Sequence, residues 1–264
     1  VWSIKGRVFW RRWDTVMPCK LPLKQLLLAS LLALASAQAV AGVVITGTRV
    51  IYPAGQKEVT VKLNNNGTQP ALMQAWIDTG SVESTPTSSK APFLLSPPVA
   101  RIDPAKGQSL RVLFTGAALA SDKESVFWLN VLEIPPKPEA GEDLNTLQMA
   151  FRSRIKLFYR PTELPGTATE AIEQVQWQVV SSRDGLGLAL QAFNPSAFYV
   201  SLVELELVSG SVRARSEDGM VAPGETRQFP LPTLKTRPAA DAQVEFNAIN
   251  DYGALIPTRK ALKP

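Results

Sequence analysis

The sequence predicts an all-β protein built from two antiparallel β-sandwiches in series. Short runs of alternating apolar and polar residues recur along the chain, and turn-forming residues separate them at intervals of about ten residues. Helical periodicity is weak in every segment. A proline-containing break at 160–165 divides the runs into two groups, so we expect a joint between two domains there.

Residues 1–16 are expected to lie outside the folded protein. They contain three of the six tryptophans of the chain but no pattern typical of a helix or strand. We interpret them as upstream translation or a mis-set start, with Met17 as the natural initiator.

Residues 17–41 are typical of a secretory signal. Two lysines precede an apolar run at 26–35. The small residues Ala39 and Ala41 are typical of a signal-peptidase site, with cleavage between Ala41 and Gly42. A membrane-spanning helix needs roughly twenty apolar residues, about twice the length of this run, so we favour a cleaved signal over an anchor. The remaining 223 of the 264 residues are enough for two domains of ordinary size.

The charge of the chain comes mainly from this leader. Residues 1–41 hold six of the 28 basic residues and one of the 23 acidic residues, so the remainder has 22 of each and no net charge. The sequence pI of about 9.4 is therefore no evidence for a nucleic-acid partner, and we expect none.

The cysteine and histidine content excludes several kinds of chemistry. The single cysteine, Cys19, lies in the leader, and the chain has no histidine. Catalytic Ser-His-Asp and Cys-His systems and every metal site that uses histidine are thereby excluded. We expect a protein that is not an enzyme, with no catalytic residue, metal or cofactor.

The first domain is predicted at 42–160 and the second at 167–264, joined by a linker at 161–166. Turns rich in proline, glycine and asparagine separate the predicted strands in both. In the first domain we predict strands at 43–52, 58–64, 71–78, 93–95, 99–103, 109–115, 125–134 and 147–159. In the second we predict strands at 174–180, 186–194, 199–208, 212–215, 226–229 and 244–250. The polar run at 80–90 is predicted to be an exposed hairpin tip, and Trp76, Trp128 and Trp177 to be core residues.

The last strand of the first domain is the most informative. Apolar residues lie on one face of it and basic residues on the other, and at thirteen residues it is longer than the usual five or six. Either the domain buries the whole strand, or part of it remains as an edge on which a strand of another chain docks. We favour the docking edge. The apolar face holds Leu147, Met149, Phe151, Ile155, Leu157 and Tyr159, and the basic face holds Arg152, Arg154, Lys156 and Arg160.

Several ordered blocks of the sequence resemble the periplasmic pilus (fimbrial) chaperone family of the chaperone–usher pathway. The block at 119–135 is similar to the signature segment of that family. Further matching blocks occur, in order, at 48–52, 154–161, 194–200 and 249–253. The resemblance implies two immunoglobulin-like domains in a boomerang arrangement and a location in the periplasm. It also implies a cis peptide bond at 96–98.

The resemblance also implies a function, namely binding of pilus or fimbrial subunits by donor-strand complementation and their delivery to an outer-membrane usher. Arg49 and Lys156 would anchor the carboxylate at the C-terminus of a subunit. Leu147, Met149 and Phe151 would fill the groove that the incomplete subunit leaves open. Lys156 and Leu147 lie on opposite faces of the strand, which would require either a bulge or a strand that crosses from the groove into the domain junction.

The resemblance further implies an ionic network between the domains, made by Glu124, Arg160 and Asp251. An unoccupied apolar edge favours aggregation, so we expect the free protein to cover it as a homodimer. The alternative is an exported structural or adhesive β-sandwich, itself a component of a fibre. A hydrolase is disfavoured because no histidine is available as a base.

Overall fold

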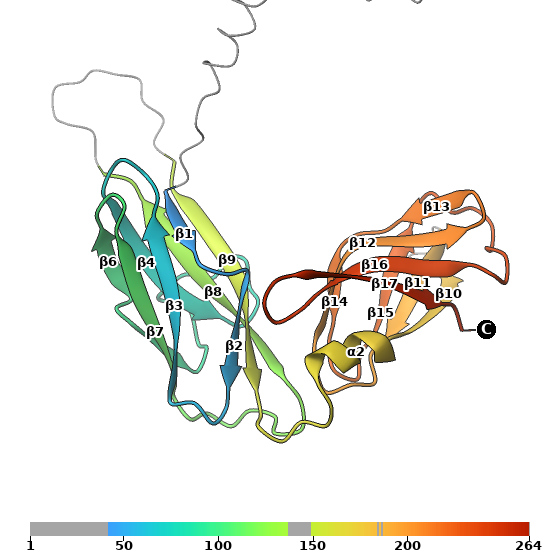
Figure 1. The fold of residues 1–264 in the computed structure, drawn as a ribbon, viewed down its shortest axis with the longest axis horizontal. Coiled ribbons are helices and arrows are strands. Elements are labelled where there is room, and N and C mark those ends of the chain that lie inside the picture. Colours follow the sequence, from blue (N-terminus) through green and yellow to red (C-terminus); the bar gives the residue numbers. More distant parts are fainter. Residues whose placement is uncertain (1–41, 137–148, 184, 186, 264) are drawn as a thin grey trace, which may run out of the picture. The chain divides into compact units, whose positions relative to one another are not determined.

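The computed structural model describes residues 42–136, 149–183, 185 and 187–263, and the fold in this part of the chain is almost entirely β. Two β-sandwiches follow one another along the chain (Figure 1). The predicted fold class is therefore confirmed. The predicted leader at 1–41 lies outside the described residues. None of the described helices is long and apolar enough to cross a membrane.

The first sandwich consists of two sheets with the strand orders β1-β3-β7-β5 and β2-β9-β8-β4-β6. All its pairings are antiparallel except that of β2 with β9, which is parallel. The strands are β1 Val43–Ile45, β2 Arg49–Pro53, β3 Glu58–Asn65, β4 Ala71–Asp78, β5 Phe93–Ser96, β6 Val99–Ile102, β7 Gly107–Phe114, β8 Ser125–Ile134 and β9 Phe151–Arg160.

The core of the first sandwich forms because alternate residues of its strands face inward. Leu63, Leu110 and Leu129 are completely buried there, and Leu157 of β9 joins them. The inward face of β9 thus belongs to the core of its own sandwich at its C-terminal half.

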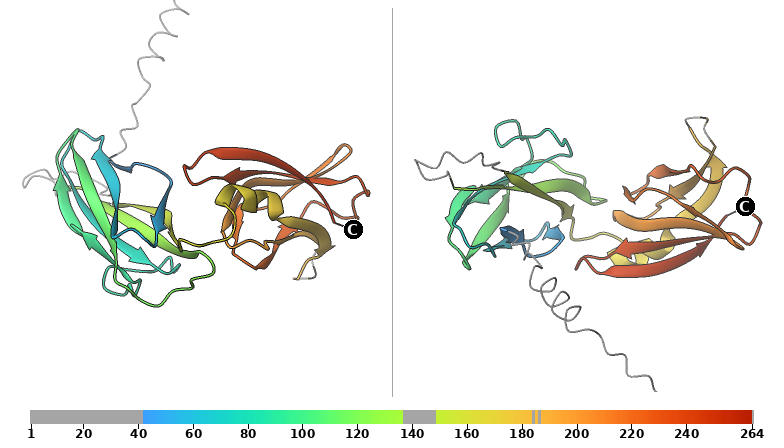
Figure 2. Two further views of the ribbon diagram at one scale, coloured as in Figure 1. Left: turned by 60° about the horizontal axis from the view of Figure 1, so that its bottom comes forward. Right: turned by 90° about the horizontal axis from the view of Figure 1, so that it is seen from above.

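The second sandwich contains the sheet β10-β11-β15 and the sheet β13-β12-β16-β17, with β14 paired to β12. Figure 2 shows the layers of both sandwiches from two further directions. The elements of the second sandwich are α2 Ala168–Gln174, β10 Gln176–Ser181, β11 Leu188–Phe193, β12 Val200–Ser209, β13 Val212–Arg215, β14 Gly219–Val221, β15 Thr226–Leu231, β16 Gln243–Ile249 and β17 Leu255–Ala261.

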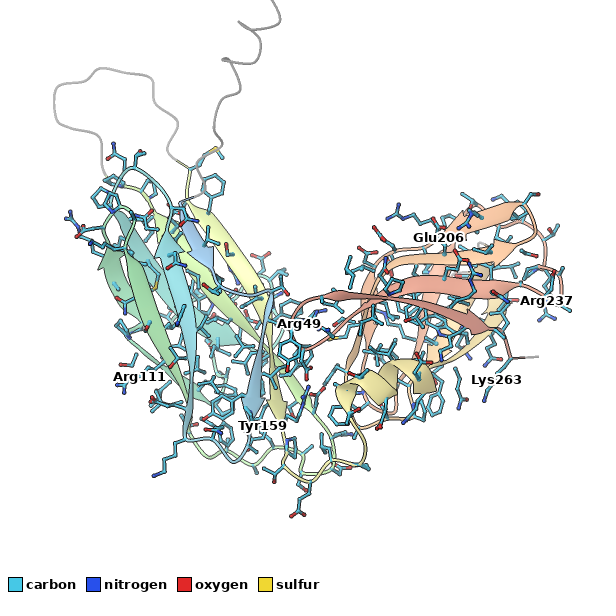
Figure 3. All side chains as sticks on the ribbon, in the orientation of Figure 1. Arg49, Arg111, Tyr159, Glu206, Arg237 and Lys263 are labelled. Carbon is cyan, nitrogen blue, oxygen red and sulfur yellow. The ribbon has the colours of Figure 1, made fainter. Side chains whose placement is uncertain are left out.

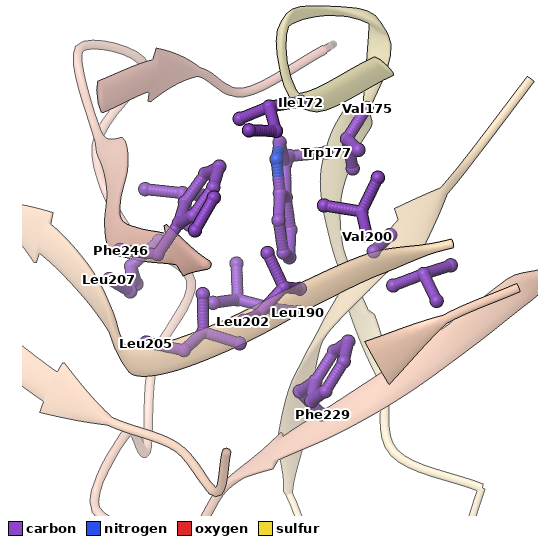
Figure 4. Close-up of a cluster of buried hydrophobic side chains, with 14 of the residues drawn as sticks. Ile172, Val175, Trp177, Leu190, Val200, Leu202, Leu205, Leu207, Phe229 and Phe246 are labelled. Atoms are coloured by element: carbon purple, nitrogen blue, oxygen red, sulfur yellow. The ribbon is translucent and has the colours of Figure 1, made fainter. Parts of the chain in front are cut away.

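Trp177 is at the centre of the second core (Figure 4). It is 1% exposed and contacts the rings of Phe229 and Phe246, with centroid distances of 6.2 and 5.4 Å. Helix α2 covers this core with Ala171 and Ile172. The prediction of Trp177 as a core residue is confirmed.

Four elements differ from the sequence prediction, and one of them is the three-residue strand β14, which was not predicted. The run at 43–52 is two strands in different sheets, because Gly47 has a φ of +102° and turns the chain from β1 to β2. Helix α2 was not predicted, although Thr167 and Glu170 form a capping box at its start. Strand β17 was also missed, since Pro257 breaks its pattern; as an edge strand it tolerates the proline.

Two further predictions concern single features of the first sandwich. The peptide bond Ser96–Pro97 is cis, as predicted. Trp128 is only half-buried, and the Arg154 guanidinium lies 4.2 Å from its ring centroid, so its prediction as a core residue was wrong. Trp76 is 7% exposed, but it is on the outward face of its sheet beneath Arg152 rather than in the apolar core.

Candidate functional site

The two predicted anchor cations are neighbours in the sheet. Strand β2 runs parallel to β9 (Figure 1), and the register pairs Arg49 directly with Lys156. Residues opposite one another on adjacent strands point to the same side of the sheet. The two cations, more than a hundred residues apart in the sequence, therefore lie side by side.

Both cations reach residues of the second sandwich. Arg49 Nη1 donates to the Ile249 carbonyl oxygen at 2.9 Å, near the tip of the β16–β17 hairpin (Figure 3). Lys156 Nζ donates to Ser201 Oγ of β12 at 3.2 Å. Within the described part of the chain, neither cation forms an ion pair with a carboxylate. Arg49 Nε is buried and has no hydrogen-bond partner there.

The close fit of the hairpin tip explains how Ile249 comes within reach of Arg49. Gly253 at this tip has a φ of +84°, and a Cβ on it would lie only 2.4 Å from Thr48 Oγ1. Glycine therefore allows the tip to lie directly against the residue that precedes Arg49. Tyr252 beside it is 93% exposed.

The electrostatics of the pair favour an anion. Burial, the charge of Arg49 and the charge of Arg227 lower the pKa of Lys156 to about 8. Burial also lowers the pKa of Arg49, against the opposing charges of Asp251 and Glu124. Two cations held together and partly desolvated repel one another, so a carboxylate placed between them would relieve both effects.

Strand β9 has one unpaired edge. Strand β2 pairs only with the Lys156–Arg160 half, while β8 pairs with β9 from Phe151 to Tyr159. In the described part of the chain, residues 151–155 therefore have no strand partner on the β2 side. Met149 and Phe151, two predicted donor residues, are 52% and 59% exposed at this end. The third, Leu147, lies outside the described residues.

Strand β9 places Lys156 on one face and Phe151 on the other without a bulge. The register between β8 and β9 is continuous from Glu133↔Phe151 to Ser125↔Tyr159. Lys156 contacts the second sandwich because it lies on the outward face, whereas Phe151 lies on the same face of β9 as the buried Leu157. A bulge within Phe151–Arg160, one of the two predicted solutions, is therefore excluded.

Glu124, Arg160 and Asp251 are in direct contact. Arg160 Nε donates to Glu124 Oε1 at 2.6 Å, and its two terminal nitrogens donate to the Asp251 carboxylate at 2.7 and 2.8 Å. The Tyr199 amide of the second sandwich donates to Glu124 Oε2 at 2.8 Å. Burial raises the pKa of Glu124, which is 3% exposed, although Arg160 opposes this shift. Burial alone would lower the pKa of Arg160, but its bonds to Asp251 and Glu124 raise it.

Sequence reasoning missed the groups that hold the two cations. Ser201 gives no signal in the sequence because β12 holds other polar residues that do not reach Lys156, and the Ile249 carbonyl is a backbone group. Arg227 was also missed, since only the structure brings its charge near Lys156. It donates to the Met220 carbonyl oxygen at 2.9 Å, and Met220 lies opposite Ser201.

Two protein-family models match the chain. The model described as "Pili and flagellar-assembly chaperone, PapD N-terminal domain" matches residues 42–165, and "Pili assembly chaperone PapD, C-terminal domain" matches 170–260. The chain is also 43% identical over 238 residues to the chaperone protein FimB/FhaD of Bordetella pertussis, covering 89% of this chain and 93% of that relative.

Solved structures give the same result. The YadV chaperone is similar with a TM-score of 0.73 and 39% identity, over 84% of this chain and all of that one. The periplasmic chaperone SfaE is similar with a TM-score of 0.63 and 29% identity, over 84% of this chain and all of that one. A chain of the Salmonella enterica complex between the SafA pilin and the SafB chaperone has a TM-score of 0.68 and 26% identity, over 86% of this chain and 99% of that chain.

Proposed function

Because this chain belongs to the PapD-like family of pilus-assembly chaperones, we propose that it binds fimbrial subunits in the periplasm through the free edge of β9. It then delivers each subunit to an outer-membrane usher. The observation that carries this proposal is the unpaired edge at 151–155, which begins at the Arg49–Lys156 pair. No chemical bond changes in this process, so the function is that of a chaperone and not of an enzyme.

The free edge is suited to pairing with another strand. An edge strand presents a row of unpaired N–H and C=O groups, on which an extended segment of a partner can form main-chain hydrogen bonds. Burial of a large apolar side chain contributes about 1.5–3 kcal/mol. Met149 and Phe151, already exposed, would supply this contribution in the groove of a subunit, and we propose that Leu147 adds to it.

The Arg49–Lys156 pair provides an anchor for the end of the partner. We propose that the C-terminal carboxylate of the subunit binds there, where no carboxylate of the described residues pairs with either cation. A guanidinium can bind a carboxylate with two parallel hydrogen bonds, and an ammonium adds a second charge. The ionic network of Arg160 would keep the two sandwiches at the angle that this anchor requires.

Co-purification tests the proposal directly. The tagged chain is expressed in a bacterium that makes fimbriae and is recovered from a periplasmic extract. The proteins that co-purify with it are identified by mass spectrometry. We expect a fimbrial subunit in stoichiometric amount. A chain that purifies alone under conditions in which subunits are made, or that appears in surface fibres, would contradict the proposal.

We predict that Phe151→Asp greatly reduces recovery of the subunit complex. A charged side chain cannot enter an apolar groove without a large desolvation cost. The free protein should keep its stability, because Phe151 is 59% exposed and contributes little to the core. Co-purification and thermal unfolding measure the two effects. Recovery equal to that of the wild type would show that Phe151 does not enter the subunit.

The affinity for a subunit should fall as the pH rises above about 8. Lys156 has a pKa of about 8 in the free protein, and a bound carboxylate favours its charged form. Binding above that pH must therefore take up a proton, which weakens affinity by at most about tenfold per pH unit. Titration calorimetry from pH 7 to 9.5 measures this slope. Lys156→Arg, which stays charged, is the control, and an equal slope in both proteins would exclude Lys156 as the titrating group.

We further propose that the free protein covers its own edge by forming a homodimer through 149–155. Sedimentation over a range of concentrations would detect association in the wild type. Phe151→Asp should remain monomeric over the same range, and equal sedimentation of the two proteins would contradict this proposal.

A further inference from the structure

The outward face of β9 is joined to a buried carboxylate, Asp78, at the end of β4. Asp78 is 2% exposed. It accepts hydrogen bonds from the Gly80 amide, Ser84 Oγ, Asn130 Nδ2 and Arg154 Nη2, each at 2.7 Å. Burial opposes its ionisation, but these bonds lower the pKa of Asp78 to about 2. The carboxylate is therefore a fixed negative charge under all ordinary conditions.

Arg152 is the outermost member of this cluster on β9. Its Nε and Nη2 donate to Asn130 Oδ1 of β8 at 2.9 and 2.7 Å. Its Nη1 donates to the Val82 carbonyl oxygen at 2.7 Å and its Nη2 to Ser84 Oγ at 3.1 Å. The guanidinium lies 4.7 Å from the ring centroid of Trp76, whose Nε1 donates to Ser84 Oγ at 3.1 Å. One side chain thus joins β9 to β8, to β4 and to the loop that follows β4.

The loop after β4 is therefore more than an exposed tip. Most of the predicted hairpin tip at 80–90 is exposed, but Ser84 is buried at 8% exposure beneath Arg152. Through Val82 and Ser84, this loop contacts Arg152 on the outward face of the sheet, on the side where β9 pairs with β8.

We infer that Arg152 is a positioning residue, clamped by Asn130 and the Val82–Ser84 segment, that holds the free edge of β9 in the extended form a partner strand requires. The inference rests on the proposed function, in which residues 151–155 pair with a subunit. Without the clamp, this end of the strand would be held by β8 alone. Ordering a segment on binding costs free energy, so a segment that is already ordered binds faster and more tightly.

The experiment compares Arg152→Ala with a matched control, Arg101→Ala. Arg152 Nη2 lies 3.7 Å from Asp78 Oδ2, and Arg101 likewise pairs with Asp103 in the same sheet. Arg101, however, lies on β6 at the opposite edge, and its side chain is 70% exposed. Hydrogen–deuterium exchange of the free protein reports on order at 149–155. Stopped-flow binding of the subunit identified by co-purification gives the association and dissociation rates.

For Arg152→Ala we expect hydrogen–deuterium exchange at 151–155 to become about tenfold faster. The association rate with the subunit should become about tenfold slower, because the segment must then be ordered during binding. Exchange elsewhere in the sandwich and the Arg101→Ala control should match the wild type. Ser84→Ala, which removes one of the two contacts of Arg152 with the loop without changing charge, should act in the same direction to a smaller extent. It also serves as the second test if Arg152→Ala fails to fold.

Arg152→Lys separates positioning from charge. A lysine keeps the charge but cannot contact Asn130, Val82 and Ser84 together in the geometry of a guanidinium. Full restoration of both rates by Arg152→Lys would overturn the inference, as would wild-type exchange at 151–155 in Arg152→Ala. If the wild type itself binds no subunit, the proposed function fails, while the exchange of the free protein still decides whether Arg152 orders the strand.

Discussion

Replacing Lys156 or Arg49 with alanine is expected to abolish recovery of the subunit complex while the free protein folds normally. Truncating one member of a desolvated, hydrogen-bonded charge pair across an interface costs roughly 2–5 kcal/mol, about thirty- to several-thousand-fold in affinity. The fold should tolerate the change because Lys156 is held next to another cation, and its lowered pKa indicates that its charge is unfavourable in the free protein. Lys156→Ala should therefore unfold at an equal or higher urea concentration at pH 7.

Co-purification and urea unfolding of the same preparations measure both parts of this prediction. Arg101→Ala, which removes an exposed arginine from the same sheet, should leave binding and stability unchanged. Normal subunit recovery by the Arg49→Ala, Lys156→Ala double variant would reject the anchor. Loss of folding in either single variant would instead assign these cations a structural role.

Arg160→Ala is expected to destabilise the protein by about 3–5 kcal/mol, since it leaves a buried carboxylate without its partner. Glu124 is 3% exposed and bonds to Arg160 at 2.6 Å, so water cannot replace the guanidinium. Asp251 is more accessible, with a third of its side chain exposed, and should contribute less. Urea unfolding at pH 7 measures the loss, and recovery of the subunit complex should fall as well.

A double-mutant cycle separates the ion pair from other effects of Arg160. Glu124→Gln keeps the shape of the side chain and removes its charge, so Arg160→Ala in that background should cost less than in the wild type. A cost below about 1 kcal/mol for Arg160→Ala alone would show that the pair acts as an ordinary surface salt bridge. An equal cost in both backgrounds would assign the effect to the packing of Arg160 on Phe198, whose ring centroid is 5.2 Å away.

The sequence was sufficient to predict the fold class because alternation and turn residues are local signals. The same signals predicted the two faces of β9, with Leu157 in the core and Lys156 directed outward. They failed where the decisive interaction is distant in the chain. Nothing local distinguishes Ser201 and Asn130 from the other polar residues of their strands, and only the folded structure shows that one contacts Lys156 and the other Arg152.

Some misses had a signal that was present but weak. The capping box of Thr167 and Glu170 marks the start of a helix of only seven residues, too short for its periodicity to appear. Trp128 was predicted to be in the core, yet an aromatic face can equally bind a cation, as it does with Arg154. Residue type alone cannot distinguish these outcomes, because both remove the ring from water.

If the C-terminal carboxylate of a subunit binds at the Arg49–Lys156 pair as proposed, the point at which β2 stops pairing with β9 sets the register of the whole bound strand. The Arg49–Lys156 pair lies at one end of the unpaired edge, which comprises the five residues 151–155. When the last carboxylate of a subunit is fixed at that pair, the position of every earlier side chain along β9 is determined by its distance in sequence from the C-terminus. Since side chains alternate along an extended chain, one added C-terminal residue would turn the wrong set toward Phe151, whereas two would restore the parity.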